Sequence, residues 1–248
     1  MRHFPIFLDL TGQRIVLAGS GETAIAKLRL LLKTGAQCHV FGLDPHQQLR
    51  DWAETERIVL HGRRPEVQDL KGARLFYAAS DDETLDAEGI ALARSVGVLV
   101  NSVDNLGASD FITPAIVDRA PVCVAIGTEG TAPVLARRIK ADVEAMLPAT
   151  TGPLARLAAG FRARAAQLAP GIARRRFWAR YFDETGPSAM RNGGDAAVQV
   201  ALENLLATSL NETPEPGRVA LVGAGPGGVW RTGFYSQPVS PWLSPADS

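Results

Sequence analysis

Residues 14–32 join a short apolar run, a glycine-rich turn and a helical repeat. The run RIVLA at residues 14–18 has the composition of a buried strand, and Gly19-Ser20-Gly21 follows it directly. Apolar residues then recur through residues 23–33 at the three- and four-residue spacing of a helix. A strand, a tight turn and a helix in this order open a βαβ unit, which requires a second strand parallel to the first. This part of the chain is therefore restricted to the α/β class.

Further strands and helices alternate up to residue 101. We predict strands at residues 37–41, 57–61, 74–79 and 98–101. The sequence Ser80-Asp-Asp-Glu83 has the pattern of a capping box, which predicts a helix from there to about residue 95. Alternating strands and helices predict a parallel sheet that is covered on both faces. The predicted fold class is α/β with a Rossmann-like parallel sheet.

The pattern changes after residue 113. We predict a strand at residues 122–126, a helix at 134–147, a helical stretch at 151–182, a loop at 183–194 and a helix at 195–206. These elements divide the chain into a Rossmann-like domain at residues 1–113, a connecting segment at 114–150 and a helical domain at 151–212. The Pro-rich residues 213–217 begin a linker and tail that run from 213 to 248.

Composition excludes several classes of protein. The chain has 26 Lys and Arg against 26 Asp and Glu, so a nucleic-acid binder that depends on positive charge is not expected. No run reaches the roughly 18 apolar residues of a transmembrane helix, and the first ten residues do not form a signal peptide. The two cysteines cannot make a disulfide framework, and the four histidines show no metal-ligand spacing. We expect a cytoplasmic protein without a resident metal.

The glycine turn has the spacing of the dinucleotide-binding fingerprint. Gly19 permits the tight turn, Gly21 lets the backbone approach a pyrophosphate, and Ala24 permits close packing of the helix. Phosphates would lie at the helix N-terminus, which makes Glu22 and Thr23 further candidates for cofactor binding. A plain strand-to-helix turn is the structural alternative.

Leu43 and Asp44 follow the second predicted strand. An acidic residue at this place holds the ribose hydroxyls of NAD in such folds. No arginine follows at once to meet a 2′-phosphate, so we expect NAD rather than NADP as the cofactor. Asp44-Pro45 also fits a helix N-cap with proline at the first helical position.

Asn101 and Asp104 follow the fifth predicted strand. The carboxyl ends of parallel strands face the ligand crevice, so Asp104 could accept a proton there. A turn aspartate that bonds its own backbone is the alternative. Residues 127–133, GTEGTAP, precede a helix and could bind an anion through their amides. Thr131 as a helix cap, with Pro133 in the first turn, would explain the same pattern structurally.

Several motifs together resemble the N-terminal part of siroheme synthase, the module with precorrin-2 dehydrogenase and sirohydrochlorin ferrochelatase activities. They follow in the family order: MRHFPIFL (1–8), AGSGETAIAKLRLLL (18–32), AASDD (78–82), NSVD (101–104), SDFITP (109–114), GTAPVLAR (130–137) and RRRFW (174–178). Ser20 departs from the family's usual middle glycine, and Thr128 stands where relatives often have serine. Residues 218–227, RVALVGAGPG, resemble the start of a methyltransferase, which the following tail does not continue.

The resemblance implies NAD-dependent oxidation of the tetrapyrrole precorrin-2 to sirohydrochlorin, then insertion of ferrous iron to give siroheme. It implies that Asp104 is the catalytic proton acceptor, with Fe²⁺ arriving near it as a substrate. Thr128, Thr131 and Arg137 become candidates for substrate binding, beside Asn101 for the cofactor. The resemblance also implies a homodimer with residues 114–150 at the interface. The alternatives are a regulatory NAD-binding module without catalysis and a chelatase that has lost dehydrogenation.

Overall fold

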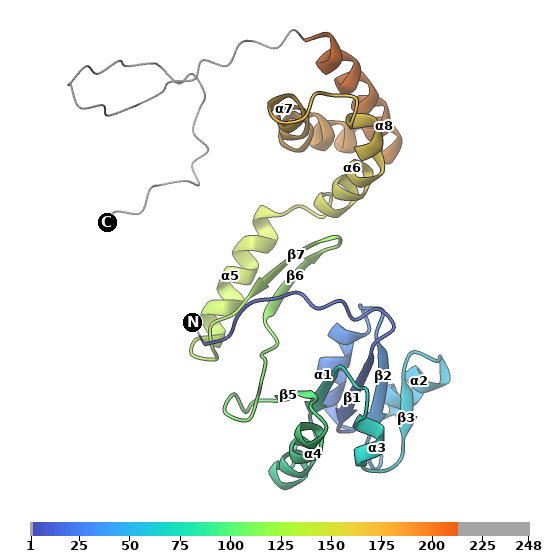
Figure 1. The fold of residues 1–248 in the computed structure, drawn as a ribbon, viewed down its shortest axis with the longest axis vertical. Helices are drawn as coiled ribbons and strands as arrows, with labels where there is room; N and C mark the ends of the chain where they lie inside the picture. The colour runs from blue at the N-terminus through green and yellow to red at the C-terminus, as the bar shows by residue number, and fades with distance from the viewer. Residues whose placement is uncertain (1, 213–248) are drawn as a thin grey trace, which may run out of the picture. The chain divides into compact units, whose positions relative to one another are not determined.

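A computed structural model describes residues 2–212, so the expected linker and methyltransferase-like start at 213–248 lie outside the described residues. The chain forms two compact units (Figure 1). The first comprises residues up to Asp118 together with Cys123–Leu147, and the second comprises Arg119–Val122 and the described residues from Pro148 onward.

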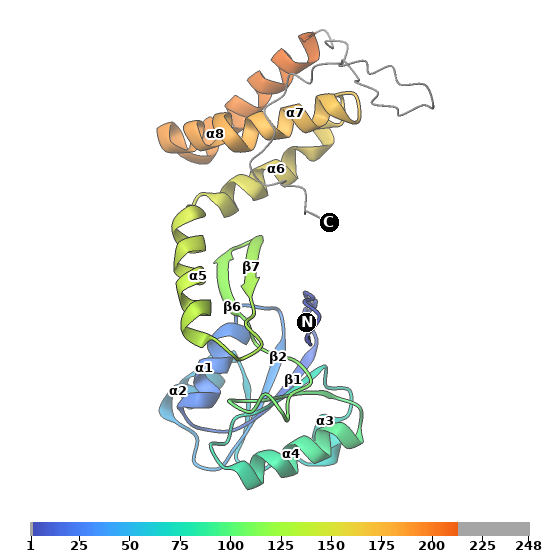
Figure 2. The same cartoon turned by 90° about the vertical axis from the view of Figure 1, so that its left-hand side faces the viewer.

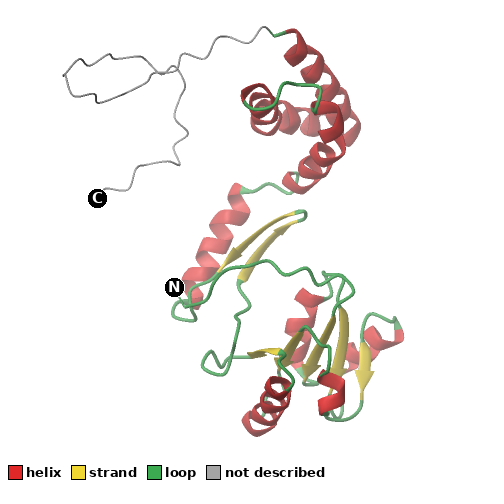
Figure 3. Cartoon of the chain, viewed as in Figure 1, coloured by secondary structure: helices red, strands yellow, loops and turns green. Residues whose placement is uncertain are grey.

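The first unit is built around a parallel five-stranded sheet (Figure 3). Its strands are β1 (Arg14–Ala18), β2 (Gln37–Phe41), β3 (Val59–His61), β4 (Leu75–Ala78) and β5 (Leu99–Ser102). The order β3-β2-β1-β4-β5 shows that the chain moves outward from β1 and then returns to the other side of β1. This reversal opens a crevice between β1 and β4 at their carboxyl ends, where ligands bind in such sheets. The predicted α/β class is confirmed.

Helices cover both faces of this sheet (Figure 2). On one face lie α1 (Glu22–Leu31) and α2 (Gln47–Glu54), and on the other lie α3 (Val67–Leu70) and α4 (Glu83–Ser95). Alternate residues of a strand point to opposite faces, so Leu17 packs with α1 while Val16 packs with α4. A helix in the place of α2 was considered only through the N-cap alternative at Asp44-Pro45. Helix α3 was not predicted, because its four residues are too few for a helical period.

Helix α4 spans the predicted residues, but its cap differs from the prediction. Asp82 is the N-cap, and its carboxylate accepts hydrogen bonds from the backbone N–H groups of Thr84 (2.9 Å) and Leu85 (3.1 Å). Ser80 instead donates its hydroxyl to Asp86 at 2.6 Å. The capping-box prediction was therefore wrong by two residues, because Asp82 offers the helix the better-placed oxygen.

A hairpin and a long helix complete the first unit. They are β6 (Ala115–Arg119), β7 (Val122–Ile126) and α5 (Pro133–Met146), with β6 and β7 forming a separate two-stranded sheet. The structure confirms the predicted strand and helix, whereas β6 was not predicted. The ammonium of Lys33 lies 3.1 Å from the carboxylate of Asp118, which connects the end of α1 to β6.

The second unit is helical. It contains α6 (Thr151–Ala165), α7 (Ile172–Arg180), the π-helical turn η1 (Tyr181–Thr185) and α8 (Gly186–Asn211). Its core includes the buried rings of Phe161, Phe177 and Tyr181. The hydroxyl of Tyr181 donates to the carbonyl of Leu154 at 2.9 Å, so this buried polar group is paired.

The structure differs from two predictions for the second unit. The stretch at 151–182, expected to be helical, is helical except at 166–171, where Pro170 cannot continue a helix and Gly171 has a φ of 89°. The expected loop at 183–194 is largely helical, because Pro187 falls in the first turn of α8, where proline is tolerated. A break at Gly193 and Gly194 separates this part from the predicted helix at 195–206.

Within residues 2–212, no helix combines the length and apolarity that a membrane span requires. The expected cytoplasmic location stays a prediction.

Candidate functional site

The turn after β1 accepts only glycine at its first position. Gly19 has a φ of 146°, and a Cβ there would lie 1.9 Å from the carbonyl oxygen of Ala79. The N–H of Gly19 donates to the carbonyl of Phe41 at 2.8 Å. Gly19 therefore lets the ends of β1, β2 and β4 approach closely, which forms the floor of the crevice.

The N-terminus of α1 can receive an anion. Gly21 is the N-cap and no side chain caps the helix, so the first N–H groups, which have no partner within a helix, face the crevice end. The side chain of Glu22 turns to His46, with Oε1 3.4 Å from Nε2. The hydroxyl of Thr23 donates to Asp81 at 2.6 Å, which places that carboxylate beside the turn. Pyrophosphate binding by the backbone of Gly21, Glu22 and Thr23 stays a prediction.

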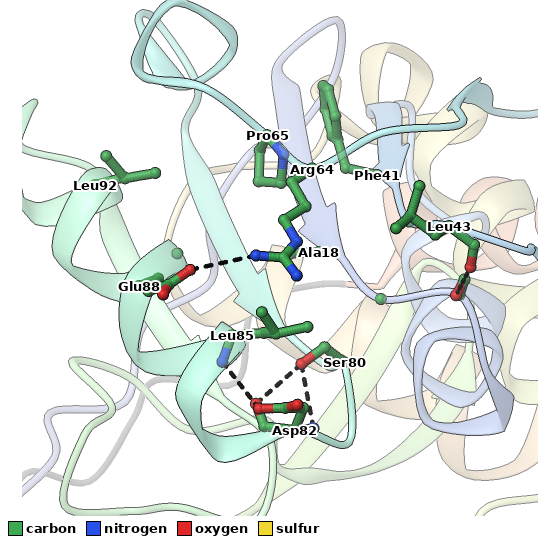
Figure 4. A pocket seen from close by; sticks show the side chains of 14 residues that line it. Ala18, Phe41, Leu43, Arg64, Pro65, Ser80, Asp82, Leu85, Glu88 and Leu92 are labelled. Atoms are coloured by element: carbon green, nitrogen blue, oxygen red, sulfur yellow. Dashed lines mark hydrogen bonds and ion pairs between the residues drawn. The ribbon is translucent and has the colours of Figure 1, made fainter.

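A cavity of about 360 Å³ lies beside this turn (Figure 4). Its lining comes from residues 18–20 after β1, 41–43 after β2, 64–65 after β3, Ser80 after β4, and α4. The volume is within the usual range for small-molecule pockets. The cavity thus joins the carboxyl ends of four neighbouring strands, β3, β2, β1 and β4, to the glycine turn, where such sheets bind their ligands.

The structure places Leu43 in the cavity wall and Asp44 just outside it. Asp44 is not a helix cap, since α2 begins at Gln47 and is capped by His46, whose Nδ1 accepts from the N–H of Gln48 at 3.1 Å. The N-cap alternative was therefore wrong. The Asp44 carboxylate is 98% exposed and lies 3.3 Å from Nη2 of Arg50.

Charged residues at this end of the crevice escaped the sequence analysis. Arg50 lies on α2, six residues after Asp44, and its ion pair with Asp44 was not predicted. Arg64 follows β3 and Glu88 lies on α4, and both line the cavity. The carboxyl ends of parallel strands face the ligand, and Arg64 follows the carboxyl end of β3. This position could have indicated Arg64 from the sequence.

Asn101 and Asp104 lie at the carboxyl end of β5. Asn101 is buried, and its Nδ2 donates to the carbonyl of Phe111 at 2.8 Å, whereas its Oδ1 has no partner among the described residues. Asp104 has a φ of 59°, a conformation that Asp and Asn tolerate. Its exposed carboxylate makes no hydrogen bond or ion pair within residues 2–212. The alternative, a turn aspartate that bonds its own backbone, was therefore wrong.

Lys27 on α1 is a further charged group near Asp104. Burial of the ammonium lowers the pKa of Lys27, and the negative charge of Asp104 opposes this shift. Within the described part of the chain, the ammonium has no hydrogen-bond or ion-pair partner. In the sequence, Lys27 stands out as a charged residue among the apolar residues of α1.

The loop before α5 carries Thr128 and Thr131. The hydroxyl of Thr131 donates to the carbonyl of Thr128 at 2.7 Å, and the N-cap of α5 is Ala132 without a side-chain cap. Thr131 as helix cap was therefore wrong, although Pro133 is in the first turn as predicted. Glu129 accepts from the backbone N–H groups of Arg2 and His3, both at 3.1 Å. Its contact with the His3 side chain lowers the pKa of Glu129 to about 2.

This loop and the Asp104 turn lie against each other. A Cβ on Gly130 would be 3.1 Å from Leu106, and one on Gly127 would be 3.5 Å from Ile112. The structure thus packs the loop that carries Thr128 and Thr131 against residues 106 and 112, which follow Asp104 in the chain. Arg137 is exposed on α5 and has no hydrogen bond to the described residues.

The described residues contain no group of three or more His, Cys, Asp or Glu side chains that could hold a metal ion.

Two family models match the chain. Residues 6–115 match the family described as "Putative NAD(P)-binding", and residues 150–206 match the "Sirohaem synthase dimerisation region". The first unit therefore belongs to the class of dinucleotide-binding domains, as the fingerprint predicted. The model named for dimerisation matches α6–α8 rather than residues 114–150, and the interface at 114–150 stays a prediction.

Curated siroheme synthases are similar to this chain. The chain is 39% identical to siroheme synthase of Nitrosococcus oceani, 41% to that of Chromobacterium violaceum and 42% to that of Methylococcus capsulatus. Each comparison covers 92% of this chain and 48% of the relative. The chain is similar to these siroheme synthases over nearly its whole length and spans about half of theirs.

A solved structure shows the same fold. The protein titled "SirC, precorrin-2 dehydrogenase" matches with a TM-score of 0.65 at 18% identity, over 85% of this chain and 100% of that one.

Proposed function

We propose that this chain oxidises precorrin-2 to sirohydrochlorin with NAD⁺ and then inserts ferrous iron to give siroheme. The observation that carries the proposal is the free carboxylate of Asp104, which lies at the carboxyl edge of a dinucleotide-binding sheet and beside the loop of Thr128 and Thr131. The similarity to siroheme synthases supports a role in siroheme synthesis. Because the chain spans only about half the length of these relatives, the two activities named here are proposals for this chain.

The oxidation removes two electrons and two protons from the macrocycle. NAD⁺, when bound, supplies the acceptor for a hydride. Asp104 takes the remaining proton, because its carboxylate has no competing hydrogen bond within the described residues. Asn101 offers its free buried Oδ1 to the cofactor, since a buried carbonyl oxygen without a partner is costly and a ligand donor would satisfy it. General base catalysis of this kind typically contributes about 10²- to 10⁴-fold.

Iron insertion is the second proposed step and the lyase part of the activity. Fe²⁺ is a substrate that replaces two pyrrole protons of sirohydrochlorin, and Asp104 is the proposed acceptor here too. Thr128 and Thr131 would bind the macrocycle, and Arg137 would meet one of its carboxylates, for which a guanidinium is suited. We further propose a homodimer, supported by the match of residues 150–206 to a dimerisation region.

The decisive experiment is turnover of precorrin-2 by the purified chain, followed by its absorption spectrum, with and without NAD⁺ and Fe²⁺. We expect sirohydrochlorin only when NAD⁺ is present, and siroheme when Fe²⁺ is added to that product. An unchanged spectrum despite measurable NAD⁺ binding would favour a regulatory module. Metal insertion into supplied sirohydrochlorin without any oxidation of precorrin-2 would favour a chelatase alone.

Asp44 and Arg50 should set the choice between NAD⁺ and NADP⁺. We expect wild-type protein to bind NAD⁺ more tightly, because the Asp44 carboxylate repels a 2′-phosphate. Asp44→Ala should improve NADP⁺ binding by about threefold to tenfold, the scale of an exposed charge interaction. Arg50→Ala should weaken NADP⁺ binding and leave NAD⁺ binding nearly unchanged, because it removes the cation that offsets Asp44.

Isothermal titration calorimetry with both dinucleotides measures these affinities. Glu54→Ala is the matched control, since Glu54 is exposed on the same helix as Arg50 and lies outside the cavity lining. Equal or tighter binding of NADP⁺ by the wild-type chain would show that Asp44 does not hold the ribose.

A further inference from the structure

A single ion pair crosses the cavity beside the glycine turn. Nη1 of Arg64 lies 3.6 Å from Oε2 of Glu88, with Arg64 extending from the segment after β3 and Glu88 from α4 (Figure 4). The third charged residue of the lining, Asp82, already caps α4. Arg64 and Glu88 are therefore the charges that remain available to a ligand.

The residue before Arg64 is fixed firmly. Arg63 donates two hydrogen bonds to the carboxylate of Asp69, at 2.7 and 2.8 Å, and its guanidinium lies 5.2 Å from the centre of the Phe41 ring. The hydrogen bonds from Arg63 lower the pKa of Asp69 to about 2. The backbone at this point is thus held in place, so Arg64 reaches into the cavity from a defined position.

The pair itself is weakly held. Both side chains are 61% exposed, and an exposed ion pair with one long contact contributes little stability. The guanidinium of Arg64 can therefore leave Glu88 for a better partner. The remaining cavity wall is largely apolar, with Phe41, Leu43 and Pro65 on the side of the strands.

Apolar walls together with a releasable guanidinium suit a flat aromatic base. Arginine stacks on aromatic rings, both through its planar shape and through its attraction to the ring electrons. We propose that Arg64 stacks on the adenine of the dinucleotide, and that Glu88 competes with the adenine for the same guanidinium. This inference rests on the proposed use of NAD⁺ and assigns Arg64 as the adenine-binding residue and Glu88 as a residue that lowers cofactor affinity.

The test compares fragments of the cofactor by calorimetry. Arg64→Ala should weaken binding of ADP-ribose and of NAD⁺ alike, by about threefold to tenfold, and leave binding of nicotinamide mononucleotide unchanged. Glu88→Gln should tighten binding of ADP-ribose by a smaller factor, about twofold to threefold. Lys71→Ala and Glu83→Gln are the controls, because both residues are exposed charged residues of the same unit and do not line the cavity.

A double variant tests the competition directly. If Glu88 acts through Arg64, Glu88→Gln should have no effect in a chain that already carries Arg64→Ala. The same tightening in both backgrounds would overturn the competition. A loss confined to NADP⁺ would show that Arg64 binds a phosphate and would overturn the stacking.

Failure of the proposed function gives a different result. A wild-type chain that binds neither NAD⁺ nor ADP-ribose would refute the cofactor itself. Normal NAD⁺ binding by both wild type and Arg64→Ala would refute only the role of Arg64.

Discussion

Asp104→Asn should lower the rate of precorrin-2 oxidation by about 10² or more, the usual scale for the loss of a general base. The amide has nearly the size of the carboxylate but cannot take up a proton at neutral pH. The variant should fold normally, because asparagine also tolerates the left-handed φ of 59° at this position. It should bind NAD⁺ like the wild type, since Asp104 does not line the cavity beside the glycine turn.

Precorrin-2 turnover and iron insertion are measured separately for this variant. If one carboxylate serves both steps, iron insertion should fall together with oxidation. Glu54→Gln provides the matched control, since it removes an exposed carboxylate elsewhere in the same unit. Wild-type rates in both assays would show that Asp104 is an ordinary turn residue, and loss of one activity would show that the two steps use different acceptors.

Gly19→Ala should destabilise the first unit by about 3 kcal/mol or more, which is a large effect for a single methyl group. The added Cβ would lie 1.9 Å from the carbonyl oxygen of Ala79, and backbone cannot move aside as a side chain can. The φ of 146° adds strain for any residue with a Cβ. Urea unfolding of the chain measures the loss as a lower midpoint.

Substitutions at Gly62 and Gly21 distinguish loss of stability from loss of cofactor binding. Gly62→Ala should change stability by less than about 0.5 kcal/mol, because a Cβ there meets open space. Gly21→Ala should remain folded, since the atom nearest its Cβ is Oδ2 of the exposed Asp81, at 3.2 Å. It should nevertheless weaken NAD⁺ binding, because the Cβ lies where the backbone approaches the pyrophosphate. A Gly19→Ala chain as stable as Gly62→Ala would contradict this account.

Local sequence determined the parallel sheet and its glycine turn. Strand and helix periods in the first hundred residues are strong because the central strands β1 and β4 are buried on both faces and the long helices α1 and α4 on one. The fingerprint needs only a few consecutive residues, so Gly19, Gly21 and Thr23 were found without knowledge of the fold. Short helices such as α2 and α3 contain too few residues to show a helical period, so local sequence does not reveal them.

The helical unit shows where local signals mislead. Asp183, Gly186 and Pro187 together indicate a loop, yet packing around Tyr181 and a proline in the first helical turn keep this stretch helical. Burial in a shared core outweighs the low helix propensity of these residues. The predicted N-caps at Asp44 and Thr131 were wrong because the helices begin later than expected. The N-cap of α2 is His46 and that of α5 is Ala132.

The tertiary structure alone decided which side chains meet. Arg64 reaches Glu88 because the segment after β3 and the first turns of α4 line the same cavity. The loop of Thr128 and Thr131 lies against the Asp104 turn through contacts that no local pattern contains. Periodicity and turn chemistry act over a few residues, whereas a site is made by residues that are distant in the chain, and their distances follow only from how the elements pack.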